Sequence, residues 1–423
     1  MKKNFYFLCL YSFLLLNGVL AQTTQQIVLG NGGIYNNDSD HVTITGISPD
    51  DYSSTLIGEV IKESIQDLFV VDNIAFVAAE DSLVKFDLVS QTKLTAIYQP
   101  NLSRLYASEE VLYVSFRTDL NGPPADGVYL RAYDFQLNEL YESTEISMDA
   151  ASMCKVGDSL YVAVPGDWQA TAGHFAVVSM DFSYVRLTNW GEDAVGIYDL
   201  ISDGSIIYTI NKSPYGATTG SVSTYNTQTT EFTTTVIPYV VGKGVAIMGS
   251  ILYLGLDNGI GSYDISSNQV IDNQVIPDPG SANYIFIAAA VLDPVNEKFY
   301  VTITDYFSMG QGIVYDMTGN EIGNFDAMVS AEAMAVHYDI DSYVNESLNM
   351  DVQVYPNPFA NLIHIDLESQ KGEISIYSIN GQLIKTLPVN PSGIYYLSEL
   401  KTGTYVLKIK TQNSITIGKL IKD

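Results

Sequence analysis

Gly157-Asp158-Ser159-Leu160 places a serine hydroxyl next to a carboxylate, a pairing that could supply a nucleophile for hydrolysis. Asp203-Gly204-Ser205, about 45 residues later, has a closely similar sequence. Gly, Asp and Ser in this order are typical of a tight turn between two strands. No Asp-x-x-His block follows to complete a catalytic triad. We therefore interpret the motif as a hairpin turn and predict no catalytic residue in it.

Metal ligands are equally sparse. His41, His174 and His337 are the histidines of the long N-terminal part, and none pairs with another at the spacing of a zinc site. Asp119, Asn121 and Asp126 could offer oxygens to calcium, but no Glu closes the loop as in an EF-hand. The sequence favours solvated turn residues there and predicts no metal site. Calcium is the single cofactor that it leaves open.

The chain has two cysteines, Cys9 and Cys154. Lys2 and Lys3 precede an apolar run from Phe5 to Leu16, and small residues follow up to Ala21. This pattern predicts a secretory signal peptide over residues 1–21, cleaved after Ala21. The exported protein would then keep Cys154 alone, so no disulfide could form within it. Its strand-like surroundings favour a buried structural thiol.

Charge excludes some partners. The net charge is −28, and residues 22–343 hold 41 acidic and 11 basic side chains. Nucleic-acid affinity comes mainly from Lys and Arg that replace phosphate counterions. We therefore expect no nucleic-acid partner and no anionic membrane partner. The acidity is explained by the solubility of an exported protein.

A short pattern recurs along the large region: a turn followed by an apolar strand with an aromatic at its third or fourth position. The aromatics are Phe76, Tyr113, Tyr161, Tyr208, Tyr253 and Tyr300, at spacings of 37 to 48 residues. Such a period suits one four-stranded blade of a β-propeller per repeat. A second landmark follows each of them, an aromatic or Met with Asp or Asn. It predicts a third strand that ends in an Asx turn, at Phe86-Asp87, Tyr133-Asp134, Met180-Asp181, Tyr225-Asn226, Tyr263-Asp264 and Tyr315-Asp316.

Six complete blades are visible, and a seventh can be assembled from both ends of the repeat region. Gln26 to Val60 offers three strands, and Ala331 to Asp339 supplies the missing inner one. Such closure leaves no free sheet edge. The sequence therefore predicts an all-β fold, with a seven-bladed β-propeller over residues 22–340.

The repeats resemble bacterial seven-bladed propellers of the YVTN, surface-layer type, with Tyr300-Val301-Thr302-Ile303 nearest to the namesake motif. More loosely they resemble Bacteroidetes surface propellers, some of which capture cobalamin. Metal-dependent lactonases are also propellers, and they gather Glu, Asn and Asp in the central channel. Asp67, Asp149 and Asp199 could mimic that set, although an Asp near a strand start is also an ordinary turn device. A propeller hydrolase or lactonase therefore stays open as an alternative, although binding without catalysis is favoured.

The loops between second and third strands are long in five of the seven blades, whereas turns between first and second strands are tight. We expect one flat face and one elaborated face, the latter formed by loops over about residues 30–41, 116–128, 164–174, 211–220 and 303–311. Exposed rings on such a face suit a sugar, a planar cofactor or a peptide. The alternative is that the rings fold back over the channel. The candidate ligand-face residues are Tyr35, Arg117, Trp168, His174, Trp190, Tyr215, Tyr306 and Phe307.

A polar stretch, residues 341–351, predicts a linker, and residues 352–423 alternate apolar and polar residues in seven short runs. The runs predict a small seven-stranded β-sandwich. Their motifs resemble the type A sorting domains of type IX secretion, found in Bacteroidetes-type bacteria. The matching residues are Tyr355, Pro356, Asn357, Pro358, Gly381, Gly403, Tyr405, Lys419 and Lys422.

The resemblance implies export through the periplasm to the cell surface or medium, with the type IX translocon and the outer-membrane attachment machinery as partners. We therefore expect a secreted or surface-exposed propeller that binds a small molecule, glycan or protein, or that serves in adhesion. A structural surface-layer role is the further alternative.

Overall fold

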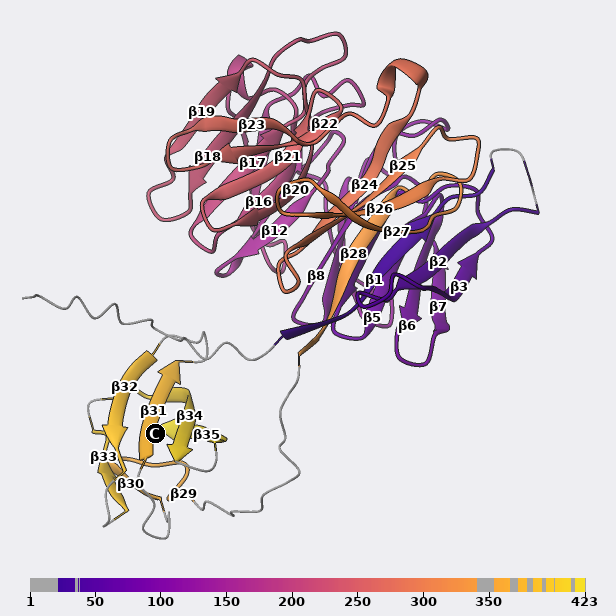
Figure 1. The fold of residues 1–423 in the computed structure, drawn as a ribbon. Helices are drawn as coiled ribbons and strands as arrows, with labels where there is room; N and C mark the ends of the chain where they lie inside the picture. The colour runs from indigo at the N-terminus through magenta and orange to yellow at the C-terminus, as the bar shows by residue number, and fades with distance from the viewer. Residues whose placement is uncertain are drawn as a thin grey trace, which may run out of the picture. The chain divides into compact units, whose positions relative to one another are not determined.

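A computed structural model describes residues 22–34, 37, 39–340, 354–365, 372–378, 383–389, 393–398, 400–411 and 415–422. The chain divides into two compact units, Met1–Asp341 and Ser342–Asp423 (Figure 1). Both consist almost entirely of antiparallel strands. The predicted signal peptide and linker lie outside the described residues. In the part of the chain that the structure describes, no helix is long and apolar enough to cross a membrane.

Within the described residues, the first unit contains seven four-stranded antiparallel sheets, which we call blades 1 to 7. From the inner to the outer strand, blade 1 contains β28 (Ala333–Ile340), β1 (Gln22–Asn31), β2 (Val42–Ile47) and β3 (Ser54–Val60); blade 2 contains β4 (Asp67–Val71), β5 (Ile74–Ala79), β6 (Ser82–Asp87) and β7 (Thr92–Tyr98); blade 3 contains β8 (Leu102–Ser108), β9 (Val111–Phe116), β10 (Leu130–Asp134) and β11 (Glu139–Ser143); and blade 4 contains β12 (Met153–Val156), β13 (Ser159–Val164), β14 (His174–Ser179) and β15 (Val185–Asn189). In the same order, blade 5 contains β16 (Ile197–Ser202), β17 (Ile206–Asn211), β18 (Gly220–Asn226) and β19 (Phe232–Ile237); blade 6 contains β20 (Val241–Met248), β21 (Ile251–Leu256), β22 (Gly259–Asp264) and β23 (Gln269–Ile276); and blade 7 contains β24 (Phe286–Asp293), β25 (Lys298–Thr304), β26 (Gln311–Asp316) and β27 (Glu321–Asp326).

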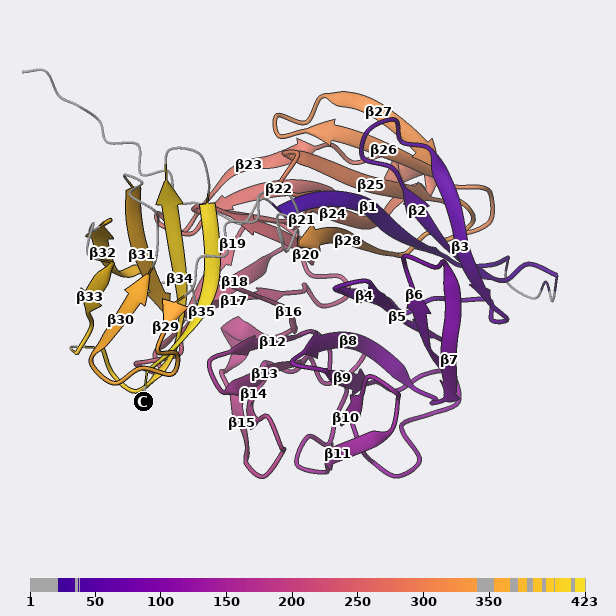
Figure 2. The ribbon, with the colours of Figure 1, turned by 90° about the horizontal axis from the view of Figure 1, so that it is seen from below.

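The blades close into a ring, which makes this unit a β-propeller. Each inner strand contacts the inner strand of the next blade, from β28 through β4, β8, β12, β16, β20 and β24 back to β28. Figure 2 shows these strands around a common centre and the outer strands at the rim. Blade 1 combines both ends of the unit, since β1 pairs with β28 from Gln22 opposite Ile340 to Gly30 opposite Ala333. The predicted all-β propeller fold is confirmed.

The repeated aromatics form the core between blades. All six lie on second strands and are buried, from Phe76 on β5 to Tyr300 on β25. Stacked blades exclude water from these rings, and burial of a large side chain contributes about 1.5–3 kcal/mol.

The turns after the third strands are Asx turns, as the sequence predicts. Asp87, for example, accepts hydrogen bonds from the amides of Val89 and Ser90. Asp316 accepts bonds from Asn320 and Thr318, which lower its pKa to about 2. The Asp carboxylates at these turns therefore stay ionised and fix the turn into the outer strand, and Asn226 does the same with its amide oxygen.

The second unit is a small sandwich of two sheets in its described residues. One sheet contains β29 (Val354–Tyr355), β30 (Leu362–Ile365) and β33 (Ile394–Tyr396). The other contains, in order, β32 (Leu383–Pro388), β31 (Gly372–Ser378), β34 (Gly403–Thr411) and β35 (Ile415–Lys422). Phe359, Ile363, Ile374 and Leu420 are buried in a shared core.

Candidate functional site

The two ends of the propeller differ as the sequence predicts. Second and third strands are joined by residues 32–41, 117–129, 165–173, 212–219 and 305–310 in blades 1, 3, 4, 5 and 7. Blades 2 and 6 have two-residue turns at 80–81 and 257–258. The strand order places all of these loops at the end where the inner strands begin, so we call it the long-loop face.

Several predicted ligand-face side chains are exposed on this face. The exposed fractions are 72% for Trp168, 88% for Tyr215 and 80% for Phe307. Tyr306, next to Phe307, is less exposed and lies 6.3 Å from Phe286 between ring centroids. Exposed rings from three separate blades therefore surround this end of the ring. Tyr35 lies outside the described residues.

Two other predicted residues are not open to a ligand in the same way. Trp190 stacks on Phe232 of the next blade, with ring centroids 4.2 Å apart and planes 11° apart. His174 begins β14, and burial lowers its pKa. Its Nδ1 atom and the Trp190 Nε1 atom are both enclosed without a hydrogen-bond partner. Trp190 therefore belongs to the packing between blades 4 and 5, and His174 pairs within blade 4.

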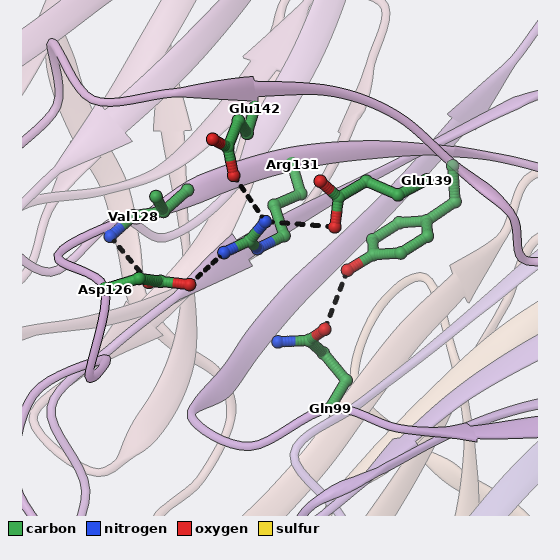
Figure 3. A network of polar contacts seen from close by, with 7 residues as sticks. Gln99, Asp126, Val128, Arg131, Glu139 and Glu142 are labelled. Atoms are coloured by element: carbon green, nitrogen blue, oxygen red, sulfur yellow. Dashed lines mark hydrogen bonds and ion pairs between the residues drawn. The ribbon is translucent and has the colours of Figure 1, made fainter.

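The long loop of blade 3 is held by a buried arginine (Figure 3). Arg131 on β10 donates to Glu139 at 3.0 Å and to Glu142 at 2.7 Å, and it also pairs with Asp126 of the loop. Asp119 accepts the amide of Asn121. The carboxylate of Asp126, one of the three side chains considered for calcium, is thus paired with the guanidinium of Arg131. In the described part of the chain, no group of three or more His, Cys, Asp or Glu is placed to hold a metal ion.

A cavity of about 420 Å³ lies at the end of the central channel. Its walls come mainly from inner strands, including Gly242 to Val245 of β20 and Ile287 to Val291 of β24, and partly from the β21–β22 turn of blade 6. Because every inner strand begins at the long-loop face, the cavity belongs to that end of the channel. Glycine and alanine dominate the β20 and β24 walls, so that the space is left open by missing side chains.

Charged side chains of different blades meet in this cavity. The Nη1 atom of Arg104 on β8 lies 3.2 Å from Asp67 of β4, and the guanidinium lies 5.3 Å from the ring centroid of Tyr198. Lys212 lies on the same ring at 5.2 Å. Burial acts to lower the pKa of Arg104, but Tyr198, Asp67 and Asp199 outweigh it, so the pKa is raised. Arg104 therefore stays charged, and it in turn lowers the pKa of the Tyr198 hydroxyl.

Lys243 and Glu332 occupy the other side of the cavity. Among the described residues, neither side chain has a hydrogen-bond partner or an ion pair within 4.0 Å. Protein surrounds Lys243, although its side chain is accessible from the channel. Burial and the nearby Arg104 lower the pKa of the lysine. Burial raises the pKa of Glu332, and Lys243 and Arg117 partly offset this effect.

Arg117 and Tyr306 connect the loops with the cavity. Both interact electrostatically with Glu332. The positive charge of Arg117 lowers the pKa of the Glu332 carboxyl, and the negative charge of Glu332 raises the pKa of Tyr306. Two of the predicted ligand-face residues are therefore close enough to interact with Glu332 of the cavity wall, while Trp168, Tyr215 and Phe307 stay on exposed loops.

The three acids compared with a lactonase set have structural roles. Asp67 accepts the amide of Leu105 in blade 3, and Asp199 accepts the amide of Gly244 in blade 6, both at 2.8 Å. Asp149 precedes its inner strand and accepts the amide and hydroxyl of Thr118. Each carboxylate thus bonds a neighbouring chain segment. Asp67 and Asp199 still contribute to the cavity wall.

Two other sequence features have the expected structural form. Gly157 to Ser159 forms the turn between β12 and β13, with Val156 paired opposite Ser159. Cys154 is buried, and burial raises the pKa of its thiol to about 12. A thiol with that pKa is not a nucleophile at neutral pH.

Arg104, Tyr198, Lys212, Lys243 and Glu332 were not among the residues selected from the sequence. One signal was present, since Lys243 lies between two glycines in an acidic domain with few bases. A lone cation in a β-strand that is otherwise small and apolar indicates a polar channel wall.

The sorting motif folds into the rim and edges of the sandwich. Tyr355 stacks on His364 with centroids 5.4 Å apart, and the side chain of Asn357 accepts the amide of Ile421. Tyr405 donates its hydroxyl to the carbonyl of Lys401, and Lys422 lies over the ring of Phe359. These contacts join the first and last segments of the unit. Gly381 lies outside the described residues.

Comparisons with known proteins identify this second unit. Residues 353–423 match a family model described as a secretion system C-terminal sorting domain. The C-terminal unit is thus a sorting domain, and the protein is exported by the type IX secretion system to the cell surface or exterior. No curated protein matches the chain.

The first unit is similar in fold to solved propeller-like structures. A Bacteroides uniformis protein provisionally described as a 6-phosphogluconolactonase matches with a TM-score of 0.54 at 10% identity, covering 74% of this chain and 99% of its own. A Bacteroides fragilis protein with the same description matches with a TM-score of 0.52 at 12% identity, covering 74% of this chain and 98% of its own. A hypothetical selenium-binding protein from Sulfolobus tokodaii matches with a TM-score of 0.54 at 10% identity, covering 74% of this chain and 90% of its own. At these identities the similarity shows the fold alone.

Proposed function

We propose that this exported propeller is a binding protein, whose ligand contacts the long-loop face and reaches the mouth of the central channel. The observation that supports the proposal most directly is the position of the cavity. It lies at the end of the channel where five long loops emerge, and three of these loops carry the exposed rings of Trp168, Tyr215 and Phe307.

The chemistry of that face suits recognition. Aromatic side chains bury a large area at low entropic cost, and a concave site with a few polar groups fixes the orientation of a ligand. The sorting domain delivers the propeller to the cell surface or exterior, where capture of an external molecule or adhesion would be useful. The ligand class at the loops is a small molecule, a glycan or a protein.

The experiment compares full-length exported protein with a variant carrying Trp168→Ala and Tyr215→Ala. Glycan, peptide and small-molecule arrays identify a ligand first, and titration calorimetry then gives its affinity. We expect the double variant to lose at least about tenfold, or about 1.4 kcal/mol, with an unchanged melting temperature. Unchanged affinity for every ligand would contradict the proposal.

A lactonase is the second candidate, because Asp67 and Asp199 lie on the cavity wall. Lactone hydrolysis measured with and without Ca²⁺ separates the two functions. Turnover that is lost in Asp67→Asn or Asp199→Asn would favour the enzyme. Self-assembly without any ligand would instead favour a structural surface-layer role.

A further inference from the structure

The charge of the propeller is strongly uneven at the cavity. Residues 22–343 contain 11 basic side chains against 41 acidic ones. Four of the 11 surround the channel end: Arg104 and Lys243 on the cavity wall, Lys212 on the ring of Tyr198, and Arg117 near Glu332. The cavity wall also holds Asp67, Asp199 and Glu332, so cations and acids are nearly balanced there, whereas acids outnumber bases almost fourfold in the domain as a whole.

The four cations are not equivalent. Arg104 is paired with Asp67, and Lys212 lies on an aromatic ring. The ammonium group of Lys243 has no counterion within 4.0 Å among the described residues, and its side chain is exposed to the cavity. An exposed cation without a counterion is open to contact with an anion that enters the cavity. A bound anion would supply the missing partner.

The cavity also sets the size of that anion. Its volume of about 420 Å³ is at the lower end of the range for ligand sites, about 300–1,000 Å³. Such a space is large enough for a small metabolite. Glu332, on the same side of the cavity as Lys243, offers a carboxyl group without a hydrogen-bond partner among the described residues, which can accept from a hydroxyl group.

We propose that the cavity binds a small hydroxylated organic anion, with its carboxylate or phosphate on Lys243 and a hydroxyl group directed at Glu332. This inference rests on the proposed binding function and names the ligand class that the channel selects. Arg104 stays with Asp67 and adds to the positive field. Binding to the outer loops would then be the entry step or a separate contact.

The test uses one carbon skeleton in three charge states. Full-length exported protein is titrated by calorimetry with glucose, gluconate and glucose 6-phosphate, and with inorganic phosphate. We expect gluconate or glucose 6-phosphate to bind at least tenfold more tightly than glucose. The preferred anion shows whether the head group is a carboxylate or a phosphate, and both results support the proposal.

Three variants at Lys243 and Glu332 locate the site, with a fourth as control. Lys243→Met should weaken anion binding at least tenfold, whereas Lys243→Arg should restore most of the affinity because it keeps the charge. Glu332→Gln should weaken only the hydroxylated anions, by a few-fold. The matched control is Lys93→Met, which removes an exposed lysine of the outer strand β7. A melting curve for each variant checks the fold.

The outcomes separate this inference from the proposed function. Equal binding of glucose and both anions, no binding of any anion, or unchanged affinity in Lys243→Met would overturn the anion site. In those cases a ligand whose affinity depends on Trp168 and Tyr215 would still support the binding face.

Discussion

Charged side chains are paired on one side of the central channel and unpaired on the other. On the side of β4, β8 and β16, which we call the paired wall, Asp67 binds Arg104 and the amide of Leu105, and Asp199 binds the amide of Gly244. On the side of β20, β24 and β28, the open wall, glycine and alanine leave space and Lys243 and Glu332 stay apart. The paired charges therefore hold neighbouring blades together, while the unpaired ones are available to a ligand.

The strongest test of the comparison is Asp67→Ala, which removes the carboxylate of the paired wall. Arg104 would be left buried without its counterion, and the Leu105 amide would lose its acceptor. We expect a loss of about 3–5 kcal/mol in the free energy of unfolding, measured by urea denaturation. Asp158→Ala, in an exposed turn, is the control. Equal losses in the two variants would break the assignment of a structural role to Asp67.

Asp199→Ala should have a smaller effect. It leaves the Gly244 amide without its side-chain acceptor, which costs about 1–3 kcal/mol for a buried donor. Asp199→Asn keeps an acceptor oxygen and should recover most of the stability. If the Asn variant is as unstable as the Ala variant, the charge of Asp199 matters more than its hydrogen bond.

Glu332→Gln probes the open wall and should change stability least, by less than about 1 kcal/mol. Burial raises the pKa of Glu332, while Lys243 and Arg117 act in the opposite direction and Tyr306 lies nearby. A raised pKa in the folded state gives stability that is complete below the ordinary value of 4.5 and is lost as the pH rises through the folded value. The free energy of unfolding of the Gln variant, relative to that of the native protein, should therefore increase as the pH rises from 4 to 7. A decrease in the relative stability of the Gln variant over this pH range would show that Glu332 is paired.

The sequence allowed the ring to be predicted because its signals are local. Phe76 and Tyr300 mark second strands by spacing, and Asp87 and Asp316 mark turns by their own hydrogen bonds. The cavity depends instead on which inner strands face one another across the ring. Arg104 and Asp67 are 37 residues apart in sequence but meet through the blade order. Loop length predicted the elaborated face, but it could not show that Trp190 would stack on Phe232.

The most direct measurement is a pair of double-mutant cycles in urea, one for Asp67 with Arg104 and one for Lys243 with Glu332. We expect a coupling energy of about 3 kcal/mol or more across the paired wall and less than about 1 kcal/mol across the open wall. Equal coupling energies, or a larger value for Lys243 with Glu332, would contradict this expectation.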